Sequence, residues 1–346
     1  MTTSDVRITE LGTDAAEWDA FVRLAPSGSP YHLTAWKRAV EDAFGHRAHY
    51  LMAWRRERLD GVLPLFEVSG LLGGRSLISV PYAVYGGVCA ESPETRRALV
   101  DAATQLARAR SARYIEFRER RDLGLGLPTK SLYVTFARAI AKDPEENARA
   151  IPRKQRRMTR QGAKHGLRVE IGAEHFDAFY AIYAQSLRNL GSPVFPKALV
   201  RGVHDHFGKD AELLTVWRGE RMLAGVLTLY FEDQVLPYYA GALRDGLPYA
   251  VNDFMYWELM CRAAERGCRV FDFGRSREGT GPYHFKRHWG FEPVPLPYQY
   301  VLLDGDRLPD LTPSNPRLRL ATRVWKRLPL PLTNALGPIL TRYLPG

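Results

Sequence analysis

Several features that would place this chain in a common class of protein are missing from its sequence. Its 346 residues contain only three cysteines, Cys89, Cys261 and Cys268, an odd number without the spacing of metal ligands. The first residues contain neither the basic segment nor the apolar stretch of a signal peptide. We therefore expect reduced cysteines, no bound metal and residence in the cytoplasm.

Motifs of several enzyme classes are missing as well. No Gly-x-Ser-x-Gly run marks a hydrolase nucleophile, and no kinase catalytic loop precedes the Asp-Phe-Gly at 272–274. Lys286 follows a glycine-rich run, but neither a glycine before it nor a Ser or Thr after it completes a P-loop. The pair His204 and His206 has no third ligand at a recognisable spacing.

Acidic residues are missing from two strongly basic segments. The net charge is +11, and residues 147–169 contain eight Lys or Arg without an acid. Residues 311–346 contain six more, again without an acid, so the remainder of the chain is slightly acidic. Two local segments, rather than a generally basic surface, are therefore expected to meet anions.

The two halves of the chain resemble each other. The segment 54–65, WRRERLDGVLPL, recurs at 217–229 as WRGERMLAGVLTL, and shorter matches keep the same order on either side. This pattern predicts a tandem duplication of an α/β unit with helices, antiparallel strands, a helix and closing strands. In the second copy we expect helices over 174–190, 197–207 and 252–266, and strands over 211–218, 222–231 and 235–242.

The repeat and the basic segments divide the chain into four parts. We expect an N-terminal domain over 1–145, a basic linker helix over 146–168, a C-terminal domain over 169–303 and a basic tail over 304–346. In the linker, Pro152 has the position of a first helical residue. Arg153, Arg157, Arg160 and Lys164 then share one helical face, which indicates an anion site for phosphate or nucleic acid as much as a solvated surface.

The tail combines basic charge with apolar residues and prolines. Two short helices are predicted, over 316–327 and 332–343, and the prolines between 329 and 338 exclude a membrane-spanning helix. Trp325 and leucines among the cations favour an anionic membrane surface over packing across the first domain.

The segment 271–291, FDFGRSREGTGPYHFKRHWGF, runs from a strand end through a glycine-rich loop into an aromatic stretch that contains Lys286. One interpretation is a packing corner. The other is a site where main-chain N–H groups and a cation meet a reacting carbonyl. In the first copy nothing corresponds to residues 279–289.

Taken together, these features resemble the FemAB-like transferases, in particular the branch associated with exopolysaccharide and PEP-CTERM sorting gene clusters. The matching motifs are PYAVYGG at 81–87, PRKQRR at 152–157, LGSP at 190–193, PYY at 237–239, DFGRS at 272–276 and YHFKRHWGF at 283–291. The resemblance implies twin GNAT-like domains with mixed, mostly antiparallel sheets flanked by helices. It also implies transfer of an acyl or aminoacyl group to an amine of a peptidoglycan or exopolysaccharide precursor.

The resemblance places the transfer site at Phe285 and Lys286, with Asp272 as a further catalytic candidate. The ammonium of Lys286 would stabilise the negative charge that develops on the carbonyl oxygen. Asp272 would accept the amine proton or cap the loop. Candidates for substrate binding, with the arginines as phosphate ligands, are Tyr85, Arg153, Lys154, Arg157, Tyr238, Tyr239, Arg275, Ser276, Thr280, Gly281, Tyr283 and Trp289.

The acyl donor is expected to be a co-substrate, either aminoacyl-tRNA, as in characterised Fem ligases, or acyl-CoA. The long helical hairpin of some Fem ligases has no room between 190 and 197, and the run at 277–281 has the wrong spacing for the pyrophosphate loop of GNAT enzymes. The partners expected are an envelope precursor, tRNA as donor carrier and the inner face of the membrane.

Three other functions fit the same residues. The first is a non-catalytic binding protein of envelope polysaccharide assembly. The second is an acyl-CoA-dependent acetyltransferase of a small amine. The third is nucleic-acid binding through residues 153–164.

Overall fold

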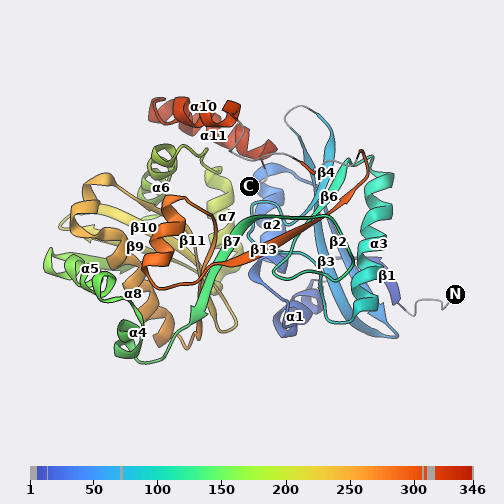
Figure 1. Ribbon diagram of the computed structural model, residues 1–346, viewed down its shortest axis with the longest axis horizontal. Helices are drawn as coiled ribbons and strands as arrows, with labels where there is room; N and C mark the ends of the chain where they lie inside the picture. The colour runs from blue at the N-terminus through green and yellow to red at the C-terminus, as the bar shows by residue number, and fades with distance from the viewer. Residues whose placement is uncertain (1–5, 14, 71–72, 306–307, 310–315, 345–346) are drawn as a thin grey trace. The chain divides into compact units, whose positions relative to one another are not determined.

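The chain forms two compact units (Figure 1). The computed structural model describes all residues except 1–5, 14, 71–72, 306–307, 310–315 and 345–346, and of 316–319 it describes the backbone. Unit 1 comprises Met1–Leu132, Pro295–Leu311 and Leu340–Gly346. Unit 2 comprises Tyr133–Val294 and Thr312–Ile339.

The duplication predicted from the sequence is present in the order of the elements. Two helices, a hairpin, a further helix and a strand occur twice at similar spacing, so the α/β class is confirmed. The first set is α1 (Ala16–Leu24), α2 (Thr34–Phe44), β2 (Ala48–Arg55), β3 (Arg58–Ser69), α3 (Pro93–Ala109) and β6 (Tyr114–Arg118). The second is α6 (Phe176–Leu190), α7 (Lys197–Phe207), β9 (Ala211–Arg218), β10 (Arg221–Phe231), α8 (Val251–Glu265) and β12 (Val270–Arg277).

Unit 1 contains a sheet in the order β1-β2-β3-β4-β6-β13, and β5 also pairs with β3. The pair β4 and β6 is parallel, and the other pairs are antiparallel. Helix α3 packs on one face, where Gly61 leaves room for Leu99. The remaining strands are β1 (Val6–Glu10), β4 (Arg75–Ser79), β5 (Cys89–Ala90) and β13 (Val294–Leu302), and a 3-10 turn covers Pro30–His32.

Unit 2 contains a sheet in the order β7-β12-β11-β10-β9-β8, in which only β11 and β12 are parallel. Residues of β10 alternate between the two faces: Val226 lies in the core with Leu259 of α8, whereas Gly225 faces Phe179 of α6. The other elements are β7 (Thr129–Ala139), α4 (Pro144–Ala150), α5 (Arg153–Lys164), β8 (Leu167–Ile171), β11 (Gln234–Ala242) and 3-10 turns over Gly208–Asp210 and Arg244–Tyr249.

Each sheet is completed by a strand that the linear repeat does not predict. Strand β7 follows β6 in the sequence but pairs with β12 of unit 2. Strand β13 follows β12 but pairs with β6 of unit 1. The compact units therefore do not coincide with two contiguous halves of the sequence.

Residues 271–291 differ from the predicted loop and aromatic stretch. Strand β12 continues to Arg277, and residues 281–288 form a helix, α9 (Gly281–His288). The helix begins after Thr280 with Pro282 in its first turn, a favourable position for proline. Gly274 and Gly279 adopt the left-handed conformation, with φ of 66° and 73°. A smaller difference concerns Pro152, which is the N-cap of α5 rather than its first residue.

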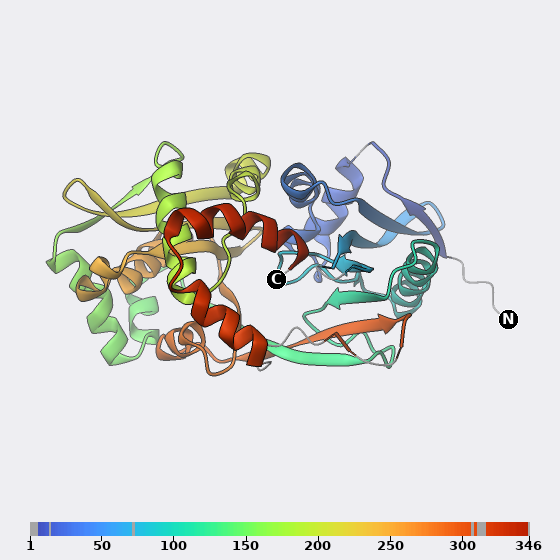
Figure 2. The ribbon, with the colours of Figure 1, turned by 90° about the horizontal axis from the view of Figure 1, so that it is seen from above.

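The tail forms the two short helices that the sequence predicts, α10 (Pro316–Trp325) and α11 (Leu330–Tyr343), drawn in red in Figure 2. Its part up to Ile339 belongs to unit 2. Trp325 Nε1 donates to the carbonyl of Ser192 at 3.2 Å, and the Arg188 guanidinium donates to the carbonyl of Lys326 at 3.3 Å. Among the described residues, no helix is long and apolar enough to cross a bilayer.

Candidate functional site

Lys286 is the centre of the candidate site, on α9 of unit 2. Its side chain reaches back to β12, where the pairing with β7 is interrupted by a bulge between Asp272 and Arg275. The Nζ donates to the backbone carbonyls of Phe273 at 2.8 Å, Gly274 at 2.9 Å and Arg275 at 3.1 Å. An ammonium has three N–H donors, and each of them donates to one backbone carbonyl of the bulge.

The environment of this ammonium is apolar. Only 8% of Lys286 is exposed, and the Nζ lies 5.5 Å from the centre of the Phe136 ring. Burial lowers the pKa of Lys286 to about 7, Asp272 opposes this shift and Arg275 adds to it. The three carbonyls, in contrast, favour the charged form. The arrangement therefore holds a cation in a region of low dielectric constant, where its field acts strongly.

Asp272 has the contacts of a capping residue. It is 2% exposed, and its Oδ1 accepts from the Gly274 amide at 2.8 Å and from the Thr135 hydroxyl at 3.3 Å. Of the two roles predicted for Asp272, these contacts favour the cap, because they fix the bulge that holds Lys286. A role as proton acceptor stays a prediction.

The aromatic candidates of α9 belong to the core. Trp289 is fully buried, and its Nε1 donates to Asp253 Oδ1 at 3.0 Å. The same oxygen accepts from the side-chain amide of Gln155 on α5. Burial raises the pKa of Asp253, although both donors oppose the shift. Tyr283 packs edge-on against Phe136, and Phe285 is half-buried beside Trp289.

The contacts of Asp253 tie the basic helix α5 to the helix that carries Lys286. Sequence reasoning missed both Asp253 and Gln155. A signal was present, because Asp253 stands in the first turn of a helix, directly before the apolar residues Phe254 and Met255. An acid there has a favourable interaction with the helix dipole but needs donors when it is buried.

Helix α5 presents its cations to solvent. Gln155, Thr159 and Gly162 form its buried face, and a Cβ added at Gly162 would lie 2.5 Å from Phe254. The exposed residues include Arg153, Lys154, Arg157, Arg160 and Lys164. Within the described part of the chain, none of these five side chains has an ion pair or a hydrogen bond. The predicted basic face is therefore present and its charge is not neutralised locally.

Strands β11 and β12 carry the remaining candidates of unit 2. They are paired only at Gln234–Val270 and Val235–Phe271, although both strands continue beyond these positions. Two buried hydroxyls near their ends, those of Tyr239 and Ser276, have no hydrogen-bond partner among the described residues. A buried polar group without a partner is costly, so each of these two hydroxyls is a candidate hydrogen-bonding group for a ligand or a water molecule.

The other predicted residues on these elements have local partners. Tyr238 packs edge-on against Tyr239 with ring centres 4.7 Å apart. The Arg275 guanidinium lies 4.5 Å from the centre of the Tyr133 ring. Thr280 closes the turn before α9 by donating to the carbonyl of Arg277 at 2.6 Å. Gly281 is exposed, and a side chain there would meet nothing within 4 Å.

Tyr85 lies in unit 1, at a cavity of about 290 Å³. The ring is 2% exposed, and the Arg120 guanidinium lies 4.0 Å from its centre. His32 and Glu119, which sequence reasoning missed, also border this cavity. Nothing in the spacing of these residues in the sequence brings them together. The fold does so through the 3-10 turn that contains His32, the end of β6 and the loop that follows β4.

Burial shifts the pKa values of His32 and Glu119 toward their neutral forms. Burial lowers the pKa of His32 to about 4 and raises that of Glu119 to about 8. Glu119 Oε1 accepts from the Val88 amide at 2.7 Å, and His32 Nε2 lies 3.0 Å from the Gly87 carbonyl. A Cβ at Gly87 would lie 1.9 Å from Glu119 Oε1, so any side chain there would displace the carboxyl group. The cavity therefore combines these two groups with charged ones, among them the buried Arg118, which is 1% exposed.

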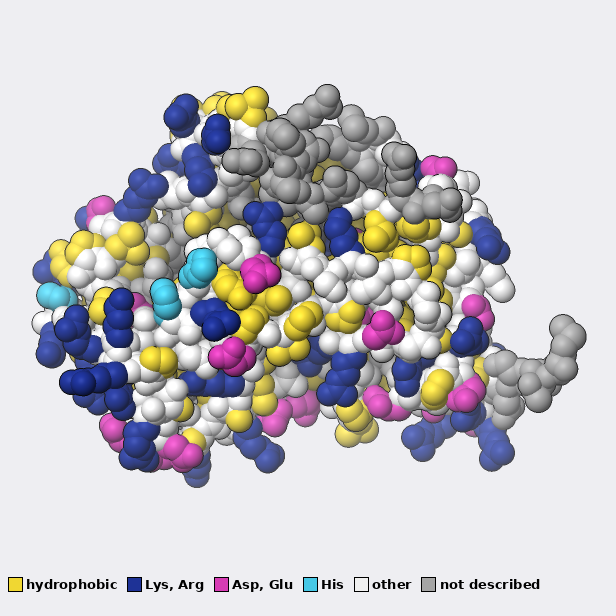
Figure 3. Space-filling view, viewed as in Figure 1, with side chains coloured by type: hydrophobic (Ala, Val, Ile, Leu, Met, Phe, Trp, Pro, Cys, Tyr) yellow, Lys and Arg dark blue, Asp and Glu magenta, His cyan; other side chains and the backbone are white. Residues whose placement is uncertain are grey.

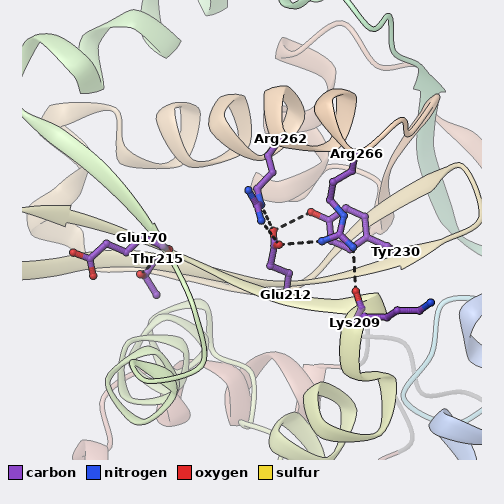
Figure 4. Close-up of polar contacts among 7 residues, drawn as sticks. All are labelled: Glu170, Lys209, Glu212, Thr215, Tyr230, Arg262 and Arg266. Carbon is purple, nitrogen blue, oxygen red and sulfur yellow. Dashed lines mark hydrogen bonds and ion pairs between the residues drawn. The ribbon is translucent and has the colours of Figure 1, made fainter.

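A further charged cluster in unit 2 is structural (Figure 4). Glu212 of β9 accepts from Arg262 at 2.5 and 2.6 Å, from Arg266 at 3.0 Å and from the Tyr230 hydroxyl at 3.1 Å. Its oxygens are thus saturated by protein donors, and the cluster fastens α8 to the sheet. In the ranges that the structure describes, no group of His, Cys, Asp or Glu is arranged to hold a metal ion.

The same fold occurs in proteins of known structure. Residues 145–287 match the acetyltransferase (GNAT) domain family. The structure is similar to FemX, with 17% identity and a TM-score of 0.70 over 86% of this chain and 98% of FemX. It is similar to a tandem GNAT protein from the clavulanic acid biosynthesis pathway, with 12% identity and a TM-score of 0.57 over 88% of this chain and all of that one.

L-PGS from Bacillus licheniformis is also similar, with 14% identity and a TM-score of 0.54 over 92% of this chain and 100% of that one. No curated protein gives a significant match to the sequence. The chain is therefore a tandem GNAT-fold protein. Within this class it is FemAB-like in its fold, as the resemblance of its motifs implies, and the exopolysaccharide and PEP-CTERM branch stays a prediction.

Proposed function

We propose that the protein is an N-acyltransferase or aminoacyltransferase that acts at the junction of β12 and α9 in unit 2. The observation that carries this proposal is the buried ammonium of Lys286, held by three carbonyls within the segment that matches the GNAT family. A structural lysine would be unusual here, because burying a charge costs free energy that an apolar residue would not.

In the proposed reaction, the amine nitrogen of the acceptor attacks the carbonyl carbon of an ester or thioester. A C–N bond forms, the C–O or C–S bond to the donor breaks, and the amine proton leaves with the departing oxygen or sulfur. Negative charge develops on the carbonyl oxygen during attack. The fixed ammonium of Lys286 stabilises this charge through space, and the bulge positions the β12 backbone beside the reacting group.

The donor we propose is a polyanion that binds the exposed cations of α5, in keeping with an aminoacyl-tRNA. Five exposed cations without local partners fit the many phosphates of a nucleic-acid backbone better than they fit a single pyrophosphate. Acyl-CoA is the second candidate, which the GNAT match favours. Salt separates the two, because binding of a nucleic acid through five phosphates would weaken steeply, with a log–log slope of about −4.

The acceptor we propose is an amine of a cell-envelope precursor of the peptidoglycan or exopolysaccharide type, and the motifs shared with FemAB-like proteins support it. A non-catalytic protein of polysaccharide assembly would bind such a precursor without turning it over.

The test is incubation of the purified protein with candidate precursors and two donor pools, acyl-CoAs and charged tRNA, followed by intact-mass analysis. A mass increment on the precursor identifies the acyl group and its donor. We expect Lys286→Met to abolish the increment and Arg287→Met, its exposed neighbour, to leave it unchanged. Binding of a precursor without an increment from either pool would refute the transferase in favour of the binding protein.

A further inference from the structure

Helix α11 is oriented against the usual pattern of a surface helix. Its inner face contains Thr333, which is 2% exposed, and Gly337, where a Cβ would lie 2.9 Å from the backbone of Val194. Its outer face contains Leu332, Leu336 and Ile339, which are 43%, 38% and 59% exposed. Surface helices normally bury their apolar stripe and expose polar residues. Here the small and polar residues contact the protein and the aliphatic ones face outward.

Helix α10 has the same feature. Leu320 and Val324, one turn apart, are 61% and 51% exposed, whereas Trp325 is buried and anchors the helix to Ser192. Thus five of the ten exposed large apolar side chains in the described part of the chain lie within residues 320–339. We call Leu320, Val324, Leu332, Leu336 and Ile339 the tail patch. Such clustering marks an interaction surface.

The charge around the tail patch identifies what covers it. Residues 311–346 contain six cations and no acid, and Arg323, Lys326 and Arg327 are exposed beside the patch. Figure 3 shows apolar and basic side chains next to one another where α10 and α11 lie. A second copy of the chain would bring these like charges together across a two-fold axis, which opposes self-association. A lipid bilayer with anionic headgroups and an apolar interior complements both the cations and the aliphatic side chains of the tail patch.

We propose that the tail patch docks the protein onto an anionic lipid bilayer, with the aliphatic side chains among the acyl chains and the cations at the headgroups. Short amphipathic helices with Lys or Arg beside aliphatic residues bind membranes in this way without spanning them. The helices stay packed on unit 2 through Trp325 and Gly337, so docking needs no unfolding of the tail. The proposal does not depend on the proposed function.

The test is flotation of the full chain with vesicles of phosphatidylcholine alone or with about one third phosphatidylglycerol. We expect binding to the anionic vesicles only. Arg323→Gln, Lys326→Gln and Arg327→Gln together should weaken it by about 100-fold at low salt, since each cation near such a surface contributes about fivefold. Leu332→Ser, Leu336→Ser and Ile339→Ser together should weaken it by at least about 100-fold.

Leu247→Ser, which removes an exposed leucine outside the tail, is the matched control and should bind as the native chain does. Urea unfolding shows whether each variant is folded, and because the altered side chains are exposed we expect native stability. No binding of the native chain to anionic vesicles overturns the proposal, as does binding that neither triple variant weakens. A dimer that the serine variant dissociates, without vesicle binding, would assign the patch to a second copy instead.

Discussion

Replacement of Lys286 by methionine tests how the buried ammonium is held. Methionine keeps the length of the side chain but removes the charge and all three donors. The shift of the lysine pKa from 10.5 to about 7 corresponds to about 5 kcal/mol between the charged and neutral forms. The methionine variant avoids this cost, but it leaves three buried carbonyls without donors, which costs about 1–3 kcal/mol for each carbonyl. The two terms are of similar size, so stability at a single pH is a poor test.

The pH dependence of the free energy of unfolding separates the cost of burying the charge from the cost of the unpaired carbonyls. The folded-state pKa is depressed, so between pH 7 and 10.5 the unfolded chain binds more protons and native stability rises with pH. This contribution is complete above pH 10.5 and is lost as the pH falls through about 7. The methionine variant lacks the contribution. By urea unfolding, we therefore expect the native chain to gain about 3 kcal/mol relative to Lys286→Met between pH 7 and pH 9.5.

Activity should change in the opposite direction. If transfer needs the ammonium, its rate falls as the pH rises through about 7, where stability begins to increase. Arg287→Met, at an exposed position one residue away, should change neither profile. A stability difference that stays flat from pH 6 to 9.5 would mean that the carbonyls keep the lysine charged throughout, and the reasoning from burial would be wrong.

Three further substitutions test the packing and charge arguments. Gly162→Ala places a Cβ against Phe254, and overpacking, less the gain in helix propensity, should cost about 1–2 kcal/mol of stability. Gly281→Ala, at an open position, should cost less than about 0.5 kcal/mol. Equal stabilities of the two variants in urea would contradict this. Burial raises the pKa of Glu119 to about 8, so its contribution to stability is complete below about pH 4.5 and is lost as the pH rises. Glu119→Gln should therefore gain up to about 4 kcal/mol over the native chain between pH 5 and 8, and a pH-independent difference would show that the carboxyl is ionised. For Glu212, burial raises the pKa, but the bonds and charges of Arg262 and Arg266 outweigh it and lower the value overall. Glu212→Gln should cost about 1–2 kcal/mol at pH 7, since the arginines are partly solvated, and thermal unfolding should show the difference shrink as the pH falls below 4.5. Glu278→Gln, at an exposed position, is the control.

The sequence by itself determined the elements, their order and their duplication. Helix and strand periods are local properties, and for this reason β9 begins and ends where the pattern predicts. The linker, predicted as one helix over 146–168, instead contains the end of α4, the whole of α5 and the start of β8. The basic faces were equally visible, because charge can be counted without a fold. The predicted loop before Lys286 was wrong because strand and helix signals meet there within a few residues around Gly279.

Only the tertiary structure decided how distant segments combine. The exchange of β7 and β13 between the sheets depends on pairing of strands far apart in sequence, which no local pattern encodes. The same holds for the three carbonyls around Lys286 and for the cavity that joins His32 to Glu119. The outward apolar face of α11 is the clearest case. Its residues have an amphipathic period, but which face meets the protein is set by the close approach at Gly337, which only the packed structure shows.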